Sequence, residues 1–463
     1  MVFLNGRSKT TCELYHEILV SDLRPSVQTS LYHCLHMPQG EASEALYKDH
    51  RTIAKNILKK INIIPDRWYQ SRLKYRNKCD VIFSYINDSS NYLGIQQRLA
   101  EKCTSLGLRT GIIHQGNLNR PLLFPEIILS EECFLPIKLQ RKIVDQCRYL
   151  YSHFRRSNIT GLQSRRDYFI LTYFALQIEG LARWAKYLLE VTDPKLVILT
   201  NAKDLQDAAL QIACADNDVT TMLIPHGFPQ MSQYPLSASL IMSYGPQHDG
   251  YLNRLSCGTD QLRGLGWLEP TVTLSGNIAS FVKETANFNE RDGYKVLFLS
   301  QLTGANRHRC PSLVEHVPAI IGALEKMDVV KTITFRLRHD EQSNLHAAKL
   351  LSGCKSQKLR ISMNNSIVDE LKANNTIMSF SSTGLLYAPY LNMKAIEIRD
   401  KKINSVWGEN ILPKEQVYQI VDSFNPNEFI DFVEQSPILQ HEEVFYNWQL
   451  ELETFTEYLH GLI

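Results

Sequence analysis

The sequence lacks the features that would place it at once in a membrane, secreted or nucleic-acid-binding class. No stretch approaches the ~20 consecutive apolar residues of a membrane-spanning helix. The first residues, MVFLNGRSKTTCELYHE, contain no apolar run of the kind that a secretory signal needs. The formal net charge of +2 gives no support for a nucleic-acid-binding protein, which usually has a strong basic bias. We therefore expect a cytoplasmic protein, whose association with the inner face of a membrane would be peripheral.

Motifs for metals, disulfides and the commonest nucleotide sites are also missing. The 10 cysteines form no CxxC pair, which indicates reduced, buried thiols. No HExxH or Cys/His spacing suggests a metal ligand set, so we expect no metal and no other cofactor. There is no GxGxxG after the first strand and no GxxxxGK[ST], which argues against a dinucleotide enzyme and a P-loop ATPase. A DxD-like triplet, Asp216–Asp218, precedes a strand instead of following one, so a helix-to-strand turn is the better interpretation.

Short apolar runs alternate with helical patterns along most of the chain, and this alternation is typical of βαβ units and parallel sheets. The first series of runs is CDVIFSYIND (79–88), RTGIIHQG (109–116), KLVILTN (195–201), TTMLIPHG (220–227), ASLIMSYG (238–245) and TVTLSG (271–276). The second series is KVLFLSQ (295–301), TITFRLRH (332–339), LRISM (359–363), TIMSFSST (376–383) and KAIEIRD (394–400). The pattern predicts an α/β protein with two Rossmann-like domains that face each other across a cleft.

We predict four segments from these series and from the polar stretch ETANFNERDGY that separates them. Residues 1–78 would form an N-terminal helical extension, and 79–283 an N-terminal Rossmann-like acceptor and catalytic domain. Residues 284–425 would form a C-terminal Rossmann-like nucleotide-binding domain, followed by helices over 426–463. Ligands of such sheets bind at the carboxyl ends of the strands, so the residues that follow the strands are the candidates for a site.

In the second domain these residues suit an anion such as the phosphate of a nucleotide. The candidates are Gln301, Arg338, His339, Ser381, Ser382, Thr383 and Gly384. A helix expected to begin near Thr383–Gly384 would add free N–H groups, because helix N-termini attract phosphate. The simpler alternative is that Ser381 or Thr383 only caps that helix. Because RH and SST follow what we take to be neighbouring strands, we favour one shared anion site.

In the first domain the strand ends supply His226, Asp204 and Asp88. His226 lies in the loop IPHGFP and could transfer a proton or stabilise developing charge. Asp204 and Asp88 could act as a general base or as a nucleophile. The alternatives are a loop histidine bonded to the backbone and two aspartates that cap helices.

The order of strand ends, with HG, YG and SGN followed by LSQ, RH and SST, resembles GT-B glycosyltransferases of bacterial surface polysaccharide synthesis. Within these, the His motif and the Ser-Ser/Thr motif resemble those of transferases that use CMP-sialic acid or CMP-Kdo. The resemblance implies that His339 and Ser381, with Ser382 or Thr383, bind the phosphate and cytidine of the donor. The sequence has Asp340 where the His motif usually has proline, and the HG loop at His226 is more like that of CDP-glycerol-dependent transferases.

Three hypotheses about function follow. The first is a metal-independent glycosyltransferase that moves a CMP-activated ulosonic acid, Kdo or sialic acid, to a glycan or glycolipid acceptor. The second keeps the fold but uses a CDP-polyol, or a UDP-sugar as a transferase or epimerase. The third is a non-catalytic subunit of a polysaccharide assembly complex, which would bind without releasing CMP.

Overall fold

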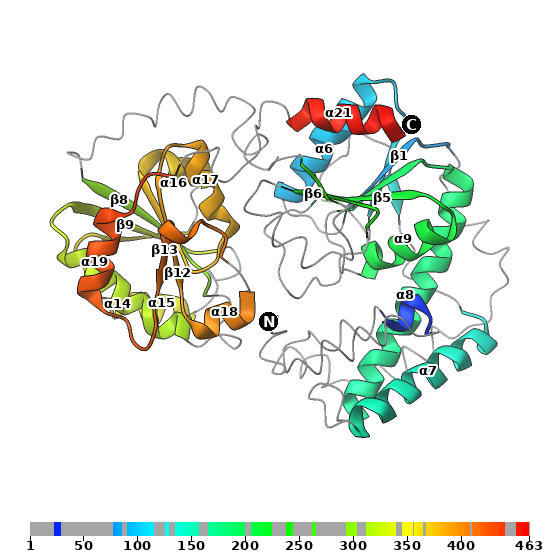
Figure 1. Ribbon diagram of the computed structural model, residues 1–463, viewed down its shortest axis with the longest axis horizontal. Coiled ribbons are helices and arrows are strands. Elements are labelled where there is room, and N and C mark those ends of the chain that lie inside the picture. Colours follow the sequence, from blue (N-terminus) through cyan, green and yellow to red (C-terminus); the bar gives the residue numbers. More distant parts are fainter. Residues whose placement is uncertain are drawn as a thin grey trace. The chain divides into compact units, whose positions relative to one another are not determined.

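The structure is a computed structural model of the 463-residue chain, and its parts form two compact units. Unit 1 comprises Met1–Ser243, Leu252–Leu265 and Gln449–Ile463, and unit 2 comprises Tyr244–Tyr251 and Gly266–Trp448. The described residues are 23–28, 77–85, 90–114, 126–128, 135–156, 165–199, 205–224, 238–243, 262–264, 293–302, 312–338, 345–354, 356–363, 367–407, 410–439 and 451–462. Each unit contains one parallel sheet with helices packed against it (Figure 1).

The sheet of unit 1 has seven strands in the order β3-β2-β1-β4-β5-β6-β7, and every neighbouring pair is parallel. The strands are β1 (Val81–Tyr85), β2 (Thr110–His114), β3 (Glu126–Ile128), β4 (Leu196–Leu199), β5 (Thr220–Leu223), β6 (Leu240–Ser243) and β7 (Leu262–Gly264). All side chains of β1, β2 and β4 are buried, as expected for parallel strands covered on both faces. The first six strands follow the order of the Rossmann fold.

Helices connect and cover the strands of unit 1. They are α6 (Ser90–Ser105), α7 (Ile137–Arg156), α8 (Arg165–Thr192), α9 (Leu205–Asp216) and α21 (Glu451–Leu462). The last helix, α21, packs against α6 (Figure 1), so the end of the chain returns to the unit in which the chain begins. None of the helices in the described ranges is both long and apolar enough to cross a membrane.

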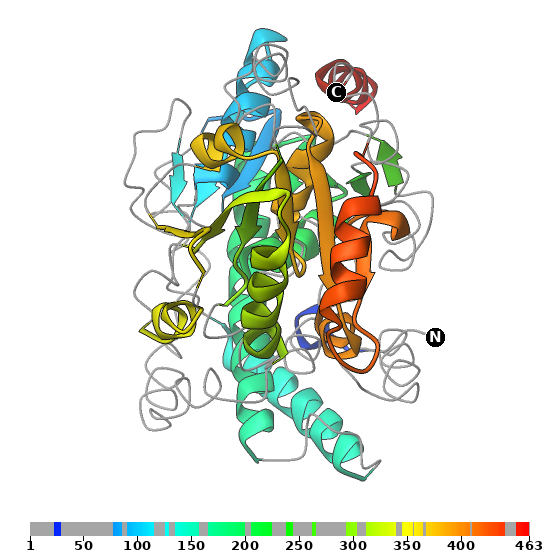
Figure 2. The same cartoon turned by 90° about the vertical axis from the view of Figure 1, so that its left-hand side faces the viewer.

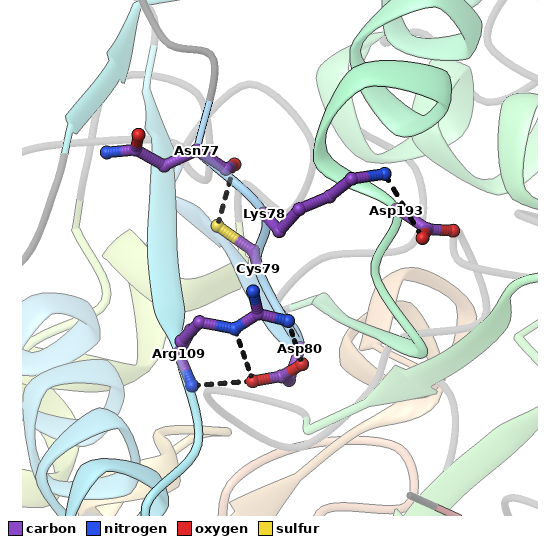
Figure 3. A network of polar contacts seen from close by, with 6 residues as sticks. All are labelled: Asn77, Lys78, Cys79, Asp80, Arg109 and Asp193. Carbon is purple, nitrogen blue, oxygen red and sulfur yellow. Dashed lines mark hydrogen bonds and ion pairs between the residues drawn. The ribbon is translucent and has the colours of Figure 1, made fainter.

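A polar network fastens the amino ends of the central strands of unit 1 (Figure 3). Arg109 donates two side-chain hydrogen bonds to Asp80, at 2.7 and 3.0 Å, and its backbone N–H donates a third at 2.8 Å. These bonds hold the pKa of Asp80 below its ordinary value. Lys78 pairs with Asp193 at 3.2 Å and ties the start of β1 to the end of α8. Ligands of such sheets bind at the opposite edge, so this network is structural.

A second polar contact ties the short segment 23–28 to α8. Arg24 donates hydrogen bonds from Nε and Nη2 to the two carboxylate oxygens of Glu179, and Ser26 donates a third at 2.7 Å. The Glu179 side chain is only 6% exposed, so a counter-charge is needed to keep the carboxylate there. Glu179 is therefore a structural residue that anchors the segment 23–28.

The sheet of unit 2 has six parallel strands in the order β10-β9-β8-β11-β12-β13, which is the complete Rossmann order. The strands are β8 (Tyr294–Leu299), β9 (Val330–Arg336), β10 (Leu359–Ser362), β11 (Thr376–Ser379), β12 (Lys394–Arg399) and β13 (Val417–Gln419). The helices are α14 (Ser312–Lys326), α15 (Leu345–Ser352), α16 (Ile367–Ala373), α17 (Tyr387–Tyr390), α18 (Lys401–Trp407) and α19 (Pro426–Gln435). The helices α14 and α19 pack side by side on one face of the sheet (Figure 2).

Most of the predicted strands are present where the apolar runs predicted them, and the α/β fold class is confirmed. The sequence did not predict β3, β7 or β13, each of which has only three residues. The predicted strand TVTLSG lies outside the described residues. The helices predicted after residue 426 divide between the units, because α19 packs in unit 2 and α21 in unit 1.

Two smaller predictions are also borne out in the described part of the chain. The triplet Asp216–Asp218 forms the turn between α9 and β5, with Asp218 in the left-handed region at φ 57°. The five cysteines in the described ranges are free thiols, and four of them are buried.

Candidate functional site

Two of the residue groups predicted for an anion site in unit 2 follow the two strands at the switch point of its sheet. In the Rossmann order the direction in which successive strands are added to the sheet reverses between the first and fourth strands, here β8 and β11. Ligands bind outside the carboxyl ends of the strands at this point. Gln301 follows β8, and Ser381–Gly384 follow β11 directly. The structure therefore brings these two predicted groups to adjacent central strands.

Packing fixes the path of the chain after β11. Phe380 is fully buried, and its ring packs edge-on against that of Phe298 at 5.6 Å. The chain then passes so close to β8 that a Cβ atom on Gly384 would lie 2.4 Å from Leu299. A glycine at this position allows the loop to lie against the end of β8, and Ser381 between these residues remains half-buried.

The helix predicted after Ser382 is a short one. It is the 3₁₀ helix η4 (Thr383–Leu386), and Ser382 caps it by accepting a hydrogen bond from the N–H of Gly384 at 3.2 Å. A serine therefore caps the helix, but it is Ser382 and not Ser381 or Thr383, the two residues named in the capping alternative. Since η4 has only four residues, its N-terminus cannot be counted as an anion site, and the hydroxyls of Ser381 and Thr383 remain the candidate donors.

The position of the RH pair differs from the prediction. Arg338 follows β9 and is exposed, but β8 lies between β9 and β11 in the sheet. The prediction that RH and SST follow neighbouring strands is therefore wrong, because the sheet order places the first strand of the unit between them. His339 lies outside the described residues. Gln301 is 6% exposed, so its side chain is buried under the strand ends.

A buried ion pair beneath Ser381 was not predicted from the sequence. Arg399, the last residue of β12, is fully buried and donates a hydrogen bond from Nη1 to Oγ of Ser381 at 2.9 Å. The same nitrogen lies 3.2 Å from Oε1 of Glu397, which is also fully buried. Oε2 of Glu397 accepts hydrogen bonds from the N–H groups of Ile411 and Leu412, at 2.7 and 2.9 Å. The pair thus connects the Ser381 loop with the segment that precedes β13.

The electrostatics of this pair are unusual for an acid. Burial raises the pKa of Glu397 to about 7, although Arg399 and the two N–H groups act in the opposite direction. Strongly shifted carboxylates in a strand-end crevice are typical of functional sites, although buried structural pairs show them too. The sequence signal is the alternation of Glu397 and Arg399 with isoleucines in KAIEIRD, which places opposite charges on one face of the strand.

A second buried carboxylate, Asp400, lies beside the ion pair at the end of β12. Asp400 accepts a hydrogen bond from Nε2 of His316 at 2.9 Å and another from the N–H of Ile403 at 2.6 Å. Burial would raise the pKa of Asp400, but the hydrogen bonds from His316, Ile403 and Ser312 lower it to about 2. Asp400 therefore caps α18 as a carboxylate and joins that helix to α14.

The carboxyl ends of unit 1 hold a polar cluster that was also not predicted. Ser84 donates to the carboxylate of Asp207, and Nε2 of Gln206 donates to Oγ of Ser84 at 2.6 Å. Gln96 donates to the carbonyl of Ser84, and His114 ends the neighbouring strand β2. All five side chains are at most 2% exposed. Gln206 and Asp207 lie in the first turn of α9, so the cluster joins this turn to the carboxyl end of β1.

The residues predicted for unit 1, His226, Asp204 and Asp88, all lie outside the described residues. Their positions in the chain are next to the cluster, because Asp204 directly precedes α9 and Asp88 follows β1 by three residues. Their roles remain predictions. Among the described residues no group of three or more His, Cys, Asp and Glu side chains could hold a metal ion.

Comparison with known proteins bears on the fold. No protein-family model matches the chain, and no curated protein is similar enough to count as a relative. A solved structure of a putative UDP-N-acetylglucosamine 2-epimerase from Listeria monocytogenes aligns with a TM-score of 0.50 at 10% identity. The alignment covers 83% of this chain and 96% of that one. At this identity the likeness shows the fold alone.

Two further solved structures align over similar lengths. The UDP-GlcNAc 2-epimerase of Neisseria meningitidis, bound to UDP-GlcNAc, aligns with a TM-score of 0.49 at 12% identity over 82% of this chain and 99% of that chain. The MurG protein of Acinetobacter baumannii aligns with a TM-score of 0.45 at 8% identity over 83% of this chain and 99% of that chain. The strand orders and the Listeria structure confirm the predicted fold, two Rossmann-like domains of the GT-B type.

Proposed function

We propose that this chain is a glycosyltransferase of the GT-B type that uses a nucleotide-activated sugar, and that unit 2 binds the nucleotide. One observation carries the proposal. The two polar groups predicted for an anion site, Gln301 and Ser381–Gly384, follow adjacent central strands at the switch point of a complete Rossmann sheet. That point is where sheets of this order bind their ligands.

The proposed roles of the residues follow from their hydrogen-bonding capacity. Ser381 already accepts a hydrogen bond from Arg399, so its own hydroxyl proton is left to donate to a phosphate oxygen. Thr383 is half-buried in the same loop and offers a second hydroxyl. Arg338 and His339 would add cationic donors from the end of β9, which strengthens the hold on a phosphate. Together they would stabilise the charge on the nucleotide as it leaves the sugar.

The donor that the family resemblance implies is a CMP-activated ulosonic acid, Kdo or sialic acid. A hydroxyl of a glycan or glycolipid acceptor would attack the anomeric carbon, the bond to the phosphate oxygen would break, and CMP would leave. His226, Asp204 and Asp88 are the proposed groups to take the acceptor proton. The second candidate donor is a UDP-sugar, because the Listeria and Neisseria proteins of similar fold carry UDP-N-acetylglucosamine in their names.

Nucleotide binding tests the first part of the proposal. Thermal unfolding would be followed with CMP, CDP, UDP, GDP and NAD, and CMP should give the largest shift. A ligand that binds only the folded state stabilises it by about 2.7 kcal/mol at a hundredfold excess over Kd. If UDP shifts the protein as far as CMP, the donor is a UDP-sugar. If no nucleotide shifts it, the glycosyltransferase proposal fails.

The residue assignment is tested with matched serine variants. Ser381→Ala should weaken CMP binding about ten- to hundredfold, since a hydrogen bond to a charged group is worth ~1.5–3 kcal/mol. Ser352→Ala is the control. Ser352 is exposed at the end of α15, and the chain leads from there to the amino end of β10, whereas the proposed site lies at the carboxyl ends of the strands. Calorimetry measures both affinities. Equal affinities for the two variants would contradict the proposed site.

Turnover distinguishes an enzyme from a non-catalytic subunit. Release of CMP from CMP-Kdo or CMP-sialic acid in the presence of a glycan acceptor is the expected result, and binding without release would favour the subunit. We expect the same rate in EDTA, as no metal ligand set was predicted. A rate that disappears in EDTA and returns with manganese would contradict metal independence. Peripheral association with a membrane also remains a prediction.

A further inference from the structure

The outer face of α7 carries a row of cationic side chains. The helix packs against the end of α8 that lies far from the sheet (Figure 1), and Ile143, Cys147 and Leu150 belong to a buried apolar cluster there. The opposite face is exposed at a spacing of three and four residues, as expected for one side of a helix. Among the described side chains of α7, the exposed charged and aromatic ones are Lys138, Arg141, Lys142, Asp145, Arg148 and Tyr149.

Most of the positive charge on this face is not neutralised. Asp145 is its one carboxylate in the described residues, and it pairs with Arg148 at 3.0 Å. Lys138, Arg141 and Lys142 form no ion pair with any residue that the structure describes. These three side chains occupy consecutive turns at the start of α7 and line a shallow hollow together with Asp145, Gln146 and Tyr149. The face therefore presents a positively charged row to the solvent.

Exposed apolar side chains accompany this row at both of its ends. Ile137 is 40% exposed and Tyr149 is 65% exposed. The rings of Tyr151 and Tyr168 lie 5.5 Å apart, so the start of α8 lies against the later part of α7. Phe169, next to Tyr168, is 52% exposed. Aromatic side chains of this kind suit the boundary between water and lipid headgroups.

We propose that the cationic face of α7 docks unit 1 onto an anionic lipid surface. Basic residues attract an acidic leaflet, and exposed aromatic rings beside them add contact with the headgroup region. Nucleic acid fits less well, because the whole chain has a net charge of only +2. An amphipathic helix in an interface inserts its apolar face, whereas here that face is already packed on α8. The docking is therefore electrostatic and reversible.

Binding to vesicles tests this surface. Vesicles of phosphatidylcholine with increasing phosphatidylglycerol should bind the full chain with increasing affinity, and salt should release it because exposed charges are screened. The triple variant Lys138→Ala/Arg141→Ala/Lys142→Ala should lose roughly a hundredfold in affinity, at about fivefold for each basic residue. The control is Lys326→Ala/Lys331→Ala/Lys349→Ala, which removes three exposed lysines of unit 2. It should bind as the parent chain does.

A second pair of variants separates lipid from other polyanions. Tyr149→Ser and Phe169→Ser should weaken vesicle binding and leave any binding to an acidic polymer, such as heparin or single-stranded DNA, unchanged. Undiminished vesicle binding by the triple variant would overturn the proposal. It would also be overturned if both polymers bind as tightly as vesicles and the aromatic variants bind vesicles normally. CMP affinity should be the same in every variant, so this test is independent of the proposed nucleotide site.

Discussion

The buried carboxylate of Glu397 should make the stability of unit 2 depend on pH in a direction opposite to that of most acids. Its neighbours are Arg399 at 3.2 Å and the N–H groups of Ile411 and Leu412. Burial outweighs them and raises the pKa from 4.5 to about 7. In the unfolded chain the same carboxyl ionises near its ordinary value, so between these two values the folded state binds more protons. Stability should therefore fall as the pH rises through this window.

The size of the effect follows from the difference between the two pKa values. One pKa unit corresponds to about 1.4 kcal/mol, so the contribution of Glu397 should amount to about 3 kcal/mol. This stabilisation is fully present below about pH 4.5 and is lost by the time the pH exceeds about 7. Glu397→Gln keeps an oxygen that can accept from Ile411 and Leu412 but cannot ionise. The variant should lack this part of the pH dependence.

The assay is urea unfolding read by hydrogen exchange of peptides from β12, which reports on unit 2 by itself. Parent, Glu397→Gln and the control Glu428→Gln would be compared from about pH 5 to about pH 8. Glu428 is an exposed carboxylate in the first turn of α19 and leaves the β12 pair untouched. The quantity compared is the difference in unfolding free energy between variant and parent as a function of pH. A cost of the substitution that does not depend on pH therefore cancels.

The expected result is a difference between Glu397→Gln and the parent that moves by about 2.5 kcal/mol in favour of the variant from about pH 5 to about pH 8. Glu428→Gln should show no such change. A difference that stays constant within about 0.5 kcal/mol over the same range would refute the reasoning. It would mean that Arg399 and the two N–H groups keep Glu397 ionised in the folded state despite its burial.

Three further substitutions test the structural polar pairs. Arg24→Ala should destabilise unit 1 by about 3 kcal/mol, because it leaves the buried carboxylate of Glu179 without a counter-charge. Arg148→Ala breaks only an exposed pair and should cost under about 0.5 kcal/mol. Hydrogen exchange of α8 in urea measures both effects. Asp400→Asn should remove about 2 kcal/mol of stability, since the carboxyl pKa falls from 3.8 to about 2. That stabilisation is present above about pH 4 and is lost as the pH falls through about 2. The stability of the parent should therefore approach that of the variant in acid, and acid unfolding curves measure this.

The fold could be predicted because parallel strands covered on both faces leave a clear mark in a sequence. β1 (VIFSY) and β8 (YKVLFL) are mostly apolar, with one polar residue each, and both are followed by polar segments. The three-residue strands β3, β7 and β13 have no such mark, because their pairing depends on neighbours already in place and not on their own composition. Strand order is a property of the whole sheet, and for this reason the position of β8 between β9 and β11 was not foreseen.

The candidate site was predictable only where a rule about strand ends applied. Ser381–Gly384 could be found because they directly follow a predicted strand. Asp207 could not, because a carboxylate in the first turn of a helix is more often a simple N-terminal charge than a buried partner of Ser84. Nor could Arg399 be paired with Ser381, 18 residues earlier, before the sheet showed that their strands are adjacent.

The contact between Arg399 and Ser381 gives the loop that follows β11 a fixed geometry that a lone serine would lack. Arg399 also donates a hydrogen bond to Asn404 at 2.8 Å. Its guanidinium therefore contacts three side chains, those of Ser381, Asn404 and Glu397. A hydroxyl that accepts a hydrogen bond from such a rigid donor points its own proton away from that donor. If Ser381 binds phosphate as proposed, its affinity for the nucleotide depends on Arg399 although that side chain is fully buried and contacts no ligand itself. The proposed nucleotide site would therefore depend on a buried residue, Arg399, as well as on the loop that the sequence predicts.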